Sequence, residues 1–416
     1  MTRKQEGEMR IASLIRLTLR LKGHRVEKVR LDNGEIVAGL AAKKRSRPIC
    51  SSCGKKIPGY DTLKKRTWRH VPVWGIPVTL VYRPRRGKCS RCGIRVEAMP
   101  WTNGKSPLTL PLIIVLSTYA RMLAFEEVAR LCGVHWNTVR AAVTNAVDYG
   151  LEHRNTTGVI AVGIDEISRR KGHKYMTMVY DLSRMRLLWC GEGRDKEALR
   201  SFFSEWGEER CEAIGAVCLD MWQPYIDVVG EMLPGAVMVF DKFHIVRHLM
   251  DAVDKVRRQE AAKLKQDDPE LLKKTRYIWL KNPENLTEGQ RVRLSDLEKL
   301  NLKINRAYIL KEAFRCFWDY TYRRNAEKYL DWWLWRATHS RLEPMRDFAW
   351  MIKRHKEEIL NYFNVPITNA SVEGMNRKAK VVSQRAYGYR TVTTFQLALY
   401  HVMGDLPMPE TTHRFL

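Results

Sequence analysis

The sequence lacks a hydrophobic run long enough to cross a membrane. Its longest apolar stretch, residues 108–116, contains a threonine and a proline and is about half the length of a bilayer span. The first residues also lack the pattern of a secretory signal peptide. We therefore expect a cytoplasmic protein that has no membrane partner.

The sequence also lacks the cysteine pattern of a disulfide-stabilised secreted protein. Five of its nine cysteines are scattered singly along the chain, a distribution that fits a reducing compartment. The other four form two closely spaced pairs, which indicate a different use.

Acidic residues are scarce. The chain has 73 Lys and Arg against 46 Asp and Glu, a formal net charge of +27. Residues 1–110 alone contain 26 basic and 7 acidic residues, which is +19 of that excess. A basic excess of this size can be a solvated face, but its concentration in one quarter of the chain favours nucleic acid as a partner. The length of 416 residues and the 45% hydrophobic content allow two to four folded units.

The paired cysteines have the spacing of zinc knuckles. Cys50 and Cys53 form one pair, Cys89 and Cys92 the other, and a glycine follows each pair. Glycine permits the tight backbone turn that directs two sulfur atoms toward one ion. The gap between the pairs exceeds that of an ordinary zinc ribbon, so we expect an insertion that forms strands. We predict one structural zinc ion bound by these four thiolates.

Turn residues and β-branched runs predict the strands around this site. Asp32-Asn33-Gly34 favours a small hairpin before the first cysteine pair, and residues 71–82 favour a second hairpin between the pairs. We expect Trp68, Trp74 and Trp101 to belong to the core of this region.

Beyond Leu110 the hydrophobic period changes to 3.6, and three helices are expected up to about Tyr149. The middle of this segment has the helix-turn-helix pattern, with a small alanine in the first helix and Gly133 at the turn. The second helix would present Asn137, Thr138 and Arg140 to a DNA major groove. An ordinary helical hairpin without DNA contacts is the alternative.

Residues from 159 onward predict an α/β sheet. Three strands in a meander (159–165, 175–181, 186–190) precede a helix, a buried strand (213–219), a second helix and a strand (237–240), the order of a ribonuclease-H-like layer. Residues 244–363 have almost no strand signal and predict a helical insertion domain.

Three carboxylates are candidates for a catalytic metal site. Asp165 and Asp220 are expected to end neighbouring parallel strands, which lie about 4.8 Å apart. We expect Glu373 at the start of a late helix capped by Asn369 or Ser371, with Arg377 and Lys380 on the same helix face to contact phosphates. Phosphodiester hydrolysis and transfer use magnesium ions held by such hard oxygen ligands. Taken singly, a carboxylate at any of these three positions is more often structural than catalytic.

Other residues compete for these positions. Asp241 ends a strand beside Asp220 and is the chief rival for a metal position. Glu166 competes with Asp165, although period-two alternation directs their side chains to opposite sheet faces. His244 and His248 stand four apart, but the glutamate of a zinc-protease motif is absent, so we assign them structural or DNA-contact roles.

Several motifs together resemble one known family. The cysteine pairs, the helix-turn-helix, Gly163-Ile164-Asp165-Glu166, Leu219-Asp220-Met221, the block 240–248 and the block Asn369-Ala370-Ser371-Val372-Glu373-Gly374-Met375-Asn376 look like a DDE transposase of the ISL-three group of prokaryotic insertion sequences. The resemblance spans roughly residues 20 to 405. Its most specific pieces are Asp-Lys-Phe-His and Asn-Ala-Ser-Val-Glu-Gly.

The resemblance implies a cytoplasmic, nucleoid-associated enzyme of a prokaryote. Its zinc finger and helix-turn-helix would bind the element's terminal inverted repeats, and a ribonuclease-H-like domain would cleave and rejoin DNA with Mg or Mn. Asp165, Asp220 and Glu373 would form the catalytic triad. The partners would be double-stranded DNA, as element ends and as target, and further copies of the chain in a homodimer or higher oligomer.

We therefore expect a multidomain α/β protein with five segments. These are a basic zinc-finger domain (1–102), a helix-turn-helix domain (103–155), the first part of the catalytic core (156–243), a helical insertion (244–363) and the completion of the core with the Glu373 helix (364–416). The alternative functions are a DNA-binding regulator derived from a transposase and a nuclease of the same fold. Acids at all three triad positions favour the enzyme over the regulator, and the dedicated recognition modules favour it over the nuclease.

Overall fold

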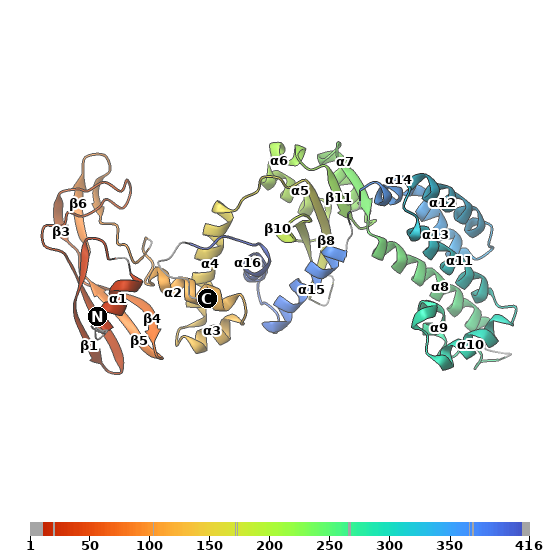
Figure 1. Ribbon diagram of the computed structural model, residues 1–416, viewed down its shortest axis with the longest axis horizontal. Coiled ribbons are helices and arrows are strands. Elements are labelled where there is room, and N and C mark those ends of the chain that lie inside the picture. Colours follow the sequence, from red (N-terminus) through yellow and green to blue (C-terminus); the bar gives the residue numbers. More distant parts are fainter. Residues whose placement is uncertain are drawn as a thin grey trace, which may run out of the picture. The chain divides into compact units, whose positions relative to one another are not determined.

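The computed structural model describes residues 11–19, 21–102, 104–170, 172, 174–264, 268–365, 367 and 370–409 (Figure 1). Contacts divide the chain into two compact units. The first unit comprises Met1–Asn155 and Val381–Leu416, and the second comprises Thr156–Lys380.

The first unit opens with helix α1 (Ile11–Thr18) and two β-sheets. A four-stranded sheet has the order β1-β2-β5-β4, and a three-stranded sheet has the order β3-β6-β7. The strands are β1 (His24–Asp32), β2 (Glu35–Ala42), β3 (Gly59–Thr62), β4 (Arg66–Val73), β5 (Ile76–Tyr82), β6 (Arg85–Cys89) and β7 (Gly93–Val96). The insertion between the cysteine pairs thus forms strands, as predicted.

Both predicted hairpins are present. Asn33 and Gly34 join β1 to β2 with φ of 48° and 78°, and Trp74 and Gly75 join β4 to β5 with φ of 50° and 80°. Two successive positive φ values are typical of the type I′ turns that match strand twist. Trp68 and Trp101 are fully buried in the core, but the expectation for Trp74 is wrong, because its turn position leaves it 87% exposed.

Three helices follow the sheets, as the change of period predicts. They are α2 (Leu110–Ala120), α3 (Phe125–Leu131) and α4 (Trp136–His153). The hydroxyl of Thr109 caps α2 by accepting a hydrogen bond from the Leu112 N–H. Gly133, with φ of +60°, makes the turn between α3 and α4.

The last helix, α16 (Val392–Met403), packs on α4 within the first unit. The Nε2 atom of His401 lies 2.6 Å from the Ser117 carbonyl oxygen, and Leu406 covers Gly150. Segment 364–416, expected to complete the catalytic core, is therefore divided. Its beginning supplies most of α15 (Ala370–Arg385) to the second unit, and residues from Val381 onward belong to the first.

The second unit contains a five-stranded sheet of order β10-β9-β8-β11-β12. Its strands are β8 (Ala161–Arg170), β9 (Lys174–Asp181), β10 (Arg186–Glu192), β11 (Ala216–Leu219) and β12 (Val237–Phe240). The first three pair antiparallel as a meander, and β11 is parallel to β8 and to β12. This is the strand order that the sequence predicts.

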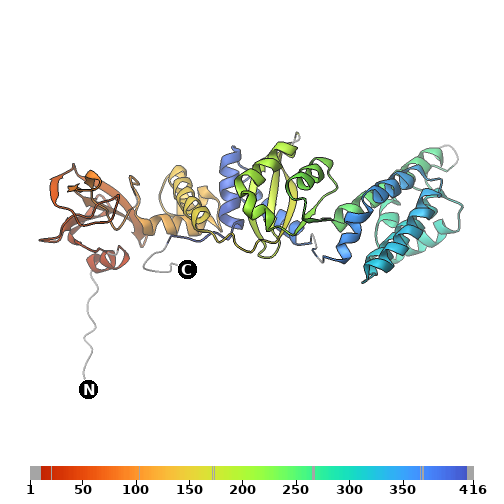
Figure 2. The ribbon, with the colours of Figure 1, turned by 90° about the horizontal axis from the view of Figure 1, so that it is seen from above.

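Helices α5 (Lys196–Trp206), α6 (Glu208–Glu212) and α7 (Gln223–Met232) connect these strands. Helix α5 packs on β9, on β10 and on α7, which in turn packs on β11 (Figure 2). Val162 and Ile164 of β8 share one core with Phe202 of α5 and Tyr225 of α7. Gly163 and Asp165 alternate to the opposite face, where Val372 of α15 lies against Gly163.

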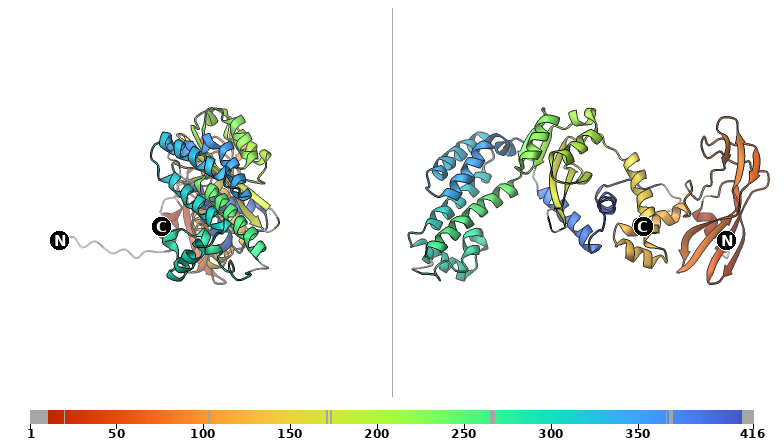
Figure 3. Two further views of the ribbon diagram at one scale, coloured as in Figure 1. Left: turned by 90° about the vertical axis from the view of Figure 1, so that its right-hand side faces the viewer. Right: turned by 180° about the vertical axis from the view of Figure 1, so that it is seen from behind.

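The described residues of segment 242–363 form helices and the connections between them, and no strand, which confirms the helical region predicted for residues 244–363. Its long helix α8 lies along α11 and α13 (Figure 3). The elements are α8 (Lys242–Leu264), α9 (Arg276–Leu280), η1 (Pro283–Asn285), α10 (Glu288–Glu298), α11 (Lys303–Arg315), η2 (Cys316–Asp319), α12 (Arg323–Thr338), α13 (Glu343–Arg354), α14 (Lys356–Leu360) and η3 (Asn361–Phe363). Within the described ranges, no helix combines the length and apolar character needed to span a bilayer.

Candidate functional site

The two cysteine pairs lie together beside the three-stranded sheet. The sulfur atoms of Cys50, Cys53, Cys89 and Cys92 all lie within 4.8 Å of one another, and those of Cys53 and Cys89 are 3.6 Å apart. Four thiolates at about 2.3 Å from one tetrahedral zinc ion have separations close to this. Among the residues that the structure describes, this is the one group of three or more His, Cys, Asp or Glu side chains that meets so closely.

In each cysteine pair, backbone hydrogen bonds lower the pKa of the first thiol and so favour the thiolate that binds a metal cation. Gly54 and Gly93 have φ of +69° and +75°, so both glycines adopt the turn that the sequence predicts. Hydrogen bonds from the backbone of Cys53 and Ser52 lower the pKa of Cys50. Those from the backbone of Arg91 and Cys92 lower the pKa of Cys89 to about 7. Since zinc binds thiolates, this geometry suits a structural zinc site.

A second cluster forms where the parallel strands of the second unit end. Cys218 of β11 pairs with Gly163 of β8, so two residues further the register brings Asp220 beside Asp165. The predicted pairing of these two strands is confirmed. Asp165 does not end its strand, however, because β8 continues to Arg170 by pairing with β9. The parallel neighbour of β8, strand β11, ends at Leu219, so β8 extends beyond the end of β11.

Asp241 joins this cluster from the next strand. Leu219 pairs with Phe240, and the Asp241 N–H donates to the Leu219 carbonyl at 3.1 Å. Asp165, Asp220 and Asp241 thus follow the register across three neighbouring strands, β8, β11 and β12.

His244 connects two of these aspartates. It lies in the first turn of α8, with Nδ1 2.6 Å from Oδ2 of Asp220 and Nε2 3.6 Å from Oδ2 of Asp241. Burial lowers the pKa of His244, but the hydrogen bond and charge of Asp220 outweigh it, so the pKa is raised. Sequence reasoning missed this contact. The spacing of His244 three residues after Asp241 at a helix start was the signal that could have indicated it.

The cluster carries more negative charge than its neighbours neutralise. Burial raises the pKa of Asp165, and the charges of Asp220 and Asp241 raise it further. Burial and the charges of Asp165 and Asp220 also raise the pKa of Glu166. For Asp220 burial is outweighed by the hydrogen bond from His244, so its pKa is lowered. A bound divalent cation would offset this excess, and carboxylate oxygens are the donors that Mg or Mn prefers. The residues therefore have the donor chemistry of such a metal site, although among the described residues no three of these side chains bring their ligand atoms within 4.8 Å of one another.

Asp165 and Glu166 leave β8 on opposite sides, as their alternation predicts. Oδ2 of Asp165 accepts a hydrogen bond from Nδ2 of Asn376 on α15. The Glu166 carboxylate lies 4.0 Å from Nη1 of Arg194, whose guanidinium stacks on the rings of Tyr175 and Trp222.

Glu373 lies on α15, one helical turn before Asn376. Its side chain is 52% exposed and pairs with Arg377 at 3.6 Å. Arg377 and Lys380 are also exposed on this helix. Among the described residues, no hydrogen bond or ion pair joins the Glu373 side chain to Asp165 or Asp220. Asn369 lies outside the described residues, as does the Ser371 side chain, so the expected cap of α15 falls there.

The helix pair α3–α4 presents polar side chains near the start of its second helix. Val139 and Ala142 of α4 are buried, whereas Asn137 and Arg140 are exposed and Thr138 is half-buried. The imidazole of His135 caps α4 by accepting a hydrogen bond from the Asn137 N–H. The three predicted DNA-contacting residues are therefore available on the outer side of α4.

Comparisons with known proteins cover the segments that contain both clusters. Residues 162–399, more than half of the chain, match the family model of ISL3 DDE enzymes, which is described as transposase. Residues 46–92 match a model described as the zinc-finger of transposase IS204/IS1001/IS1096/IS1165. The aspartate cluster lies in the first matched range, and all four zinc-site cysteines lie in the second.

Two curated relatives align over most of their length. The transposase for insertion sequence element IS1001 of Bordetella parapertussis is 29% identical over 355 residues, which cover 84% of this chain and 87% of the relative. The transposase for insertion sequence element IS1557 of Mycobacterium tuberculosis is 29% identical over 403 residues, which cover 90% of both. With its four-cysteine zinc ribbon, the chain belongs to the ISL3 family of DDE transposases.

Proposed function

We propose that this transposase binds the terminal inverted repeats of its insertion sequence and catalyses metal-dependent DNA strand cleavage and strand transfer. The observation that carries the proposal is the register of β8 and β11, which brings Asp165 and Asp220 together beside a helix that bears Glu373. In this proposal the sheet of the second unit is a ribonuclease-H-like core, and the helical region is an insertion within it.

Asp165, Asp220 and Glu373 are the proposed catalytic carboxylates. In cleavage a water oxygen bonds to phosphorus while the bond to the DNA 3′ oxygen breaks, and that oxygen leaves as a 3′-hydroxyl. In transfer the 3′-hydroxyl attacks a phosphorus of target DNA and displaces another 3′ oxygen. Bound Mg or Mn would activate the attacking oxygen and stabilise the leaving oxygen.

Neighbouring side chains hold two of these carboxylates, Asp165 and Asp220, in place. Asn376 donates to Asp165 while its own Oδ1 accepts from the Tyr180 hydroxyl at 2.7 Å, so Asp165 has a fixed orientation. His244 does the same for Asp220. Arg377 and Lys380 on α15 would contact DNA phosphates, because both are exposed cations on the helix of Glu373.

Recognition of the repeats is assigned to the helix-turn-helix formed by α3 and α4, with Asn137, Thr138 and Arg140 in the major groove. Arg140→Ala should weaken binding to repeat DNA by about 1–3 kcal/mol if the side chain reads a base. Arg324→Ala, which removes an exposed arginine from the second unit, is the matched control. Unchanged binding by Arg140→Ala would remove this residue from the interface.

The decisive experiment incubates the purified full chain and Mg with labelled DNA that carries its own element ends. Asp165→Asn, Asp220→Asn and Glu373→Gln should each abolish cleavage and leave DNA binding nearly intact. Asp227→Asn, an exposed carboxylate paired with Lys196, should cut normally. If Glu373→Gln cuts at the normal rate while Asp241→Asn does not, Asp241 replaces Glu373 in the triad. Specific binding without any cleavage would favour the regulator.

Cleavage of both element ends needs more than one active site. We therefore propose a homodimer or higher oligomer assembled on DNA. Sedimentation of the protein with and without repeat DNA tests this, and a complex with a single copy on paired ends would contradict it.

A further inference from the structure

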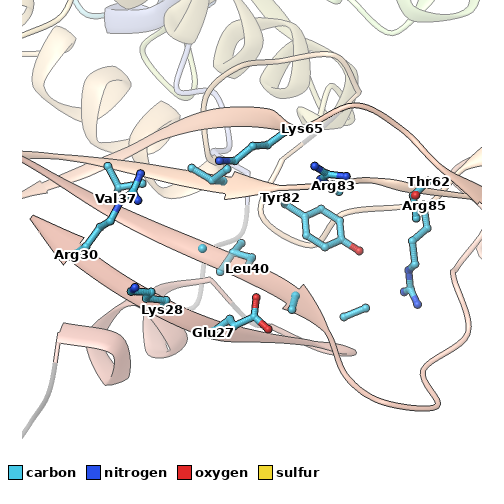
Figure 4. A pocket seen from close by; sticks show the side chains of 14 residues that line it. Glu27, Lys28, Arg30, Val37, Leu40, Thr62, Lys65, Tyr82, Arg83 and Arg85 are labelled. Atoms are coloured by element: carbon cyan, nitrogen blue, oxygen red, sulfur yellow. The ribbon is translucent and has the colours of Figure 1, made fainter. Parts of the chain in front are cut away.

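The four-stranded sheet of the first unit has a pocket on the face away from its core. Figure 4 shows the side chains that line it, which come mainly from β1, β2 and β5, with Lys65, Arg83 and the end residues Thr62 of β3 and Arg85 of β6 beside them. The pocket has a volume of about 500 Å³. All its lining residues belong to the first unit, and they include no cysteine and no residue of α4.

Alternation along β2 creates the floor of this pocket. Ile36, Ala38 and Leu40 are buried toward the core of Trp68 and Trp101, so the side chains between them point the other way. Val37, Gly39 and Ala41 occupy that face and line the pocket. Small side chains in the middle strand leave the sheet face hollow between the longer residues of its neighbours.

The wall of the pocket is basic. Five lining residues are Lys or Arg, and Glu27 is the one carboxylate among the lining residues. Glu27 pairs with Arg25 at 3.4 Å. Two of the five cations are also paired, since Arg30 lies 3.3 Å from Asp32 and Arg85 lies 2.7 Å from Glu97.

The other three cations have no anionic partner among the described residues. Lys28 on β1, Lys65 before β4 and Arg83 after β5 are exposed, and their side chains make no hydrogen bond or ion pair with that part of the chain. These three converge on one hollow from separate segments of the chain. Cations gathered around a concavity focus a positive potential there, so the arrangement favours an anionic ligand.

The types of residue that line the pocket indicate which kind of anion it binds. It contains no Asn, Gln or His, and its single aromatic residue, Tyr82, is buried and bonded to Glu97. A site for single-stranded DNA would offer exposed aromatic rings for base stacking, and a base-reading site would offer amides as well as arginines. Several cations over a hollow of small residues suit the phosphates of a duplex.

We propose that this pocket, defined by Lys28, Lys65, Arg83 and the floor residues Val37, Gly39 and Ala41, binds the sugar–phosphate backbone of double-stranded DNA without reading its sequence. The proposal rests on the proposed DNA-binding function and adds a second contact surface to the helix-turn-helix. It contributes affinity for any duplex, whereas α4 contributes the preference for the element ends.

The test compares the full chain with the triple variant Lys28→Ala, Lys65→Ala, Arg83→Ala. Binding is measured to a duplex with the element ends and to an unrelated duplex, over a series of salt concentrations. Affinity for both should fall by the same factor, so their ratio stays constant. The slope of log affinity against log salt should become shallower by about 0.9 for each phosphate that the variant no longer neutralises. Thermal unfolding and zinc content of the variant establish that the unit remains folded.

A matched control removes the same net charge elsewhere. Arg324→Ala, Lys328→Ala and Arg346→Ala together remove three exposed cations from the helical region and should leave the salt slope unchanged. The proposal is wrong if the pocket variant has the same slope of log affinity against log salt as the unaltered protein. It is also wrong if the weakening is confined to the element ends, which would indicate base reading.

A second pair of variants changes the floor and keeps every cation. A Cβ atom at Gly39 would meet only the Lys28 carbonyl oxygen, at 3.6 Å, so a side chain fits there. Gly39→Glu should weaken binding to both duplexes because it places a negative charge in the pocket, whereas Gly39→Ala should not. Equal binding by both variants contradicts the proposal. If the unaltered protein lacks preference for element ends, the proposed function fails, but the unrelated duplex still tests the pocket.

Discussion

At the scale of single residues, Asn376 connects the two parts of the proposed catalytic site. Its side chain is almost fully buried, donates to Asp165 and accepts from Tyr180. Helix α15 is thereby fixed against β8 at one amide group. Since Glu373 stands one turn away on the same helix, the distance of Glu373 from the aspartates depends on this contact.

We expect Asn376→Ala to destabilise the second unit by about 1–3 kcal/mol, because the Tyr180 hydroxyl and an oxygen of Asp165 lose a buried partner. Cleavage of element ends should fall while DNA binding persists. Denaturant unfolding and cleavage rates measure the two effects. Tyr180→Phe removes only the outer hydrogen bond and should cause the smaller loss of both. An Asn376→Ala protein that cuts normally would show that the amide does not position the site.

Two buried histidines make the first unit sensitive to acid. Burial lowers the pKa of His70 and of His401 to about 4, from an ordinary value of 6.5. His70 lies 2.9 Å from the Thr109 hydroxyl and 3.1 Å from that of Thr18. Both imidazoles are therefore neutral in the folded chain at pH values where the unfolded chain protonates them.

The stability that these two neutral histidines contribute should consequently be fully present above pH 6.5. It should decline as the pH falls from 6.5 toward 4, because only the unfolded state gains protons in this range. Each histidine contributes up to roughly 3 kcal/mol to this loss. Thermal unfolding between about pH 7 and pH 4.5 measures this loss of stability, because that range lies roughly between the unfolded and folded pKa values of the histidines. His70→Gln should give a shallower decline than the unaltered protein, and an equally steep decline would contradict the assignment to His70.

At the scale of elements, local patterns and register explain different parts of the molecule. Hairpins, knuckles and the helices α2, α3 and α4 follow from nearby residues, since turns and periodicity act over a few positions. The order of the five-stranded sheet also follows, because a meander and two crossovers leave few topologies. The residue at which β8 ends could not be predicted from local patterns, because continued pairing with β9 extends the strand past Asp165.

The cysteine element should bind one zinc ion. We expect about one equivalent of zinc in the native protein and its loss when Cys89→Ser and Cys92→Ser are combined, because two sulfur ligands do not complete a tetrahedral site. Elemental analysis measures the content. Cys316→Ser, an exposed cysteine outside the cluster, should retain the metal. Retention of full zinc by the double variant would show that other ligands hold it.

At the scale of the whole molecule, the first unit combines described residues from segment 11–155 with described residues from segment 381–409, which are far apart in the sequence. Leu406 is buried against Gly150 of α4, and the Arg121 guanidinium donates to the Leu406 carbonyl at 3.0 Å. The segments of the proposed catalytic site lie between these two parts in the sequence. Damage to this junction should therefore lower the stability of the first unit, which carries the helix pair α3–α4.

Gly150→Ala should destabilise the first unit, since its added Cβ would lie 2.6 Å from Cβ of Leu406 and 3.1 Å from the Pro407 carbonyl oxygen. We expect a loss of about 1–3 kcal/mol from this overpacking. Gly230→Ala, in helix α7, meets no atom within 4 Å and should instead stabilise its helix by up to about 1 kcal/mol. Thermal unfolding of both variants compares them, and an equal response would contradict the close packing at Gly150.

The sequence by itself determined the zinc-site cysteines, the helix pair α3–α4, the strand order and the pairing of the strands that carry Asp165 and Asp220. Each of these depends on spacing, turn chemistry or a connection rule that acts along the chain. The tertiary structure alone decided that Asp241 and His244 join Asp220, that Asn376 holds Asp165, and that Trp74 is exposed. It also placed α16 on α4, because contacts between residues distant in the sequence depend on how side chains pack in space.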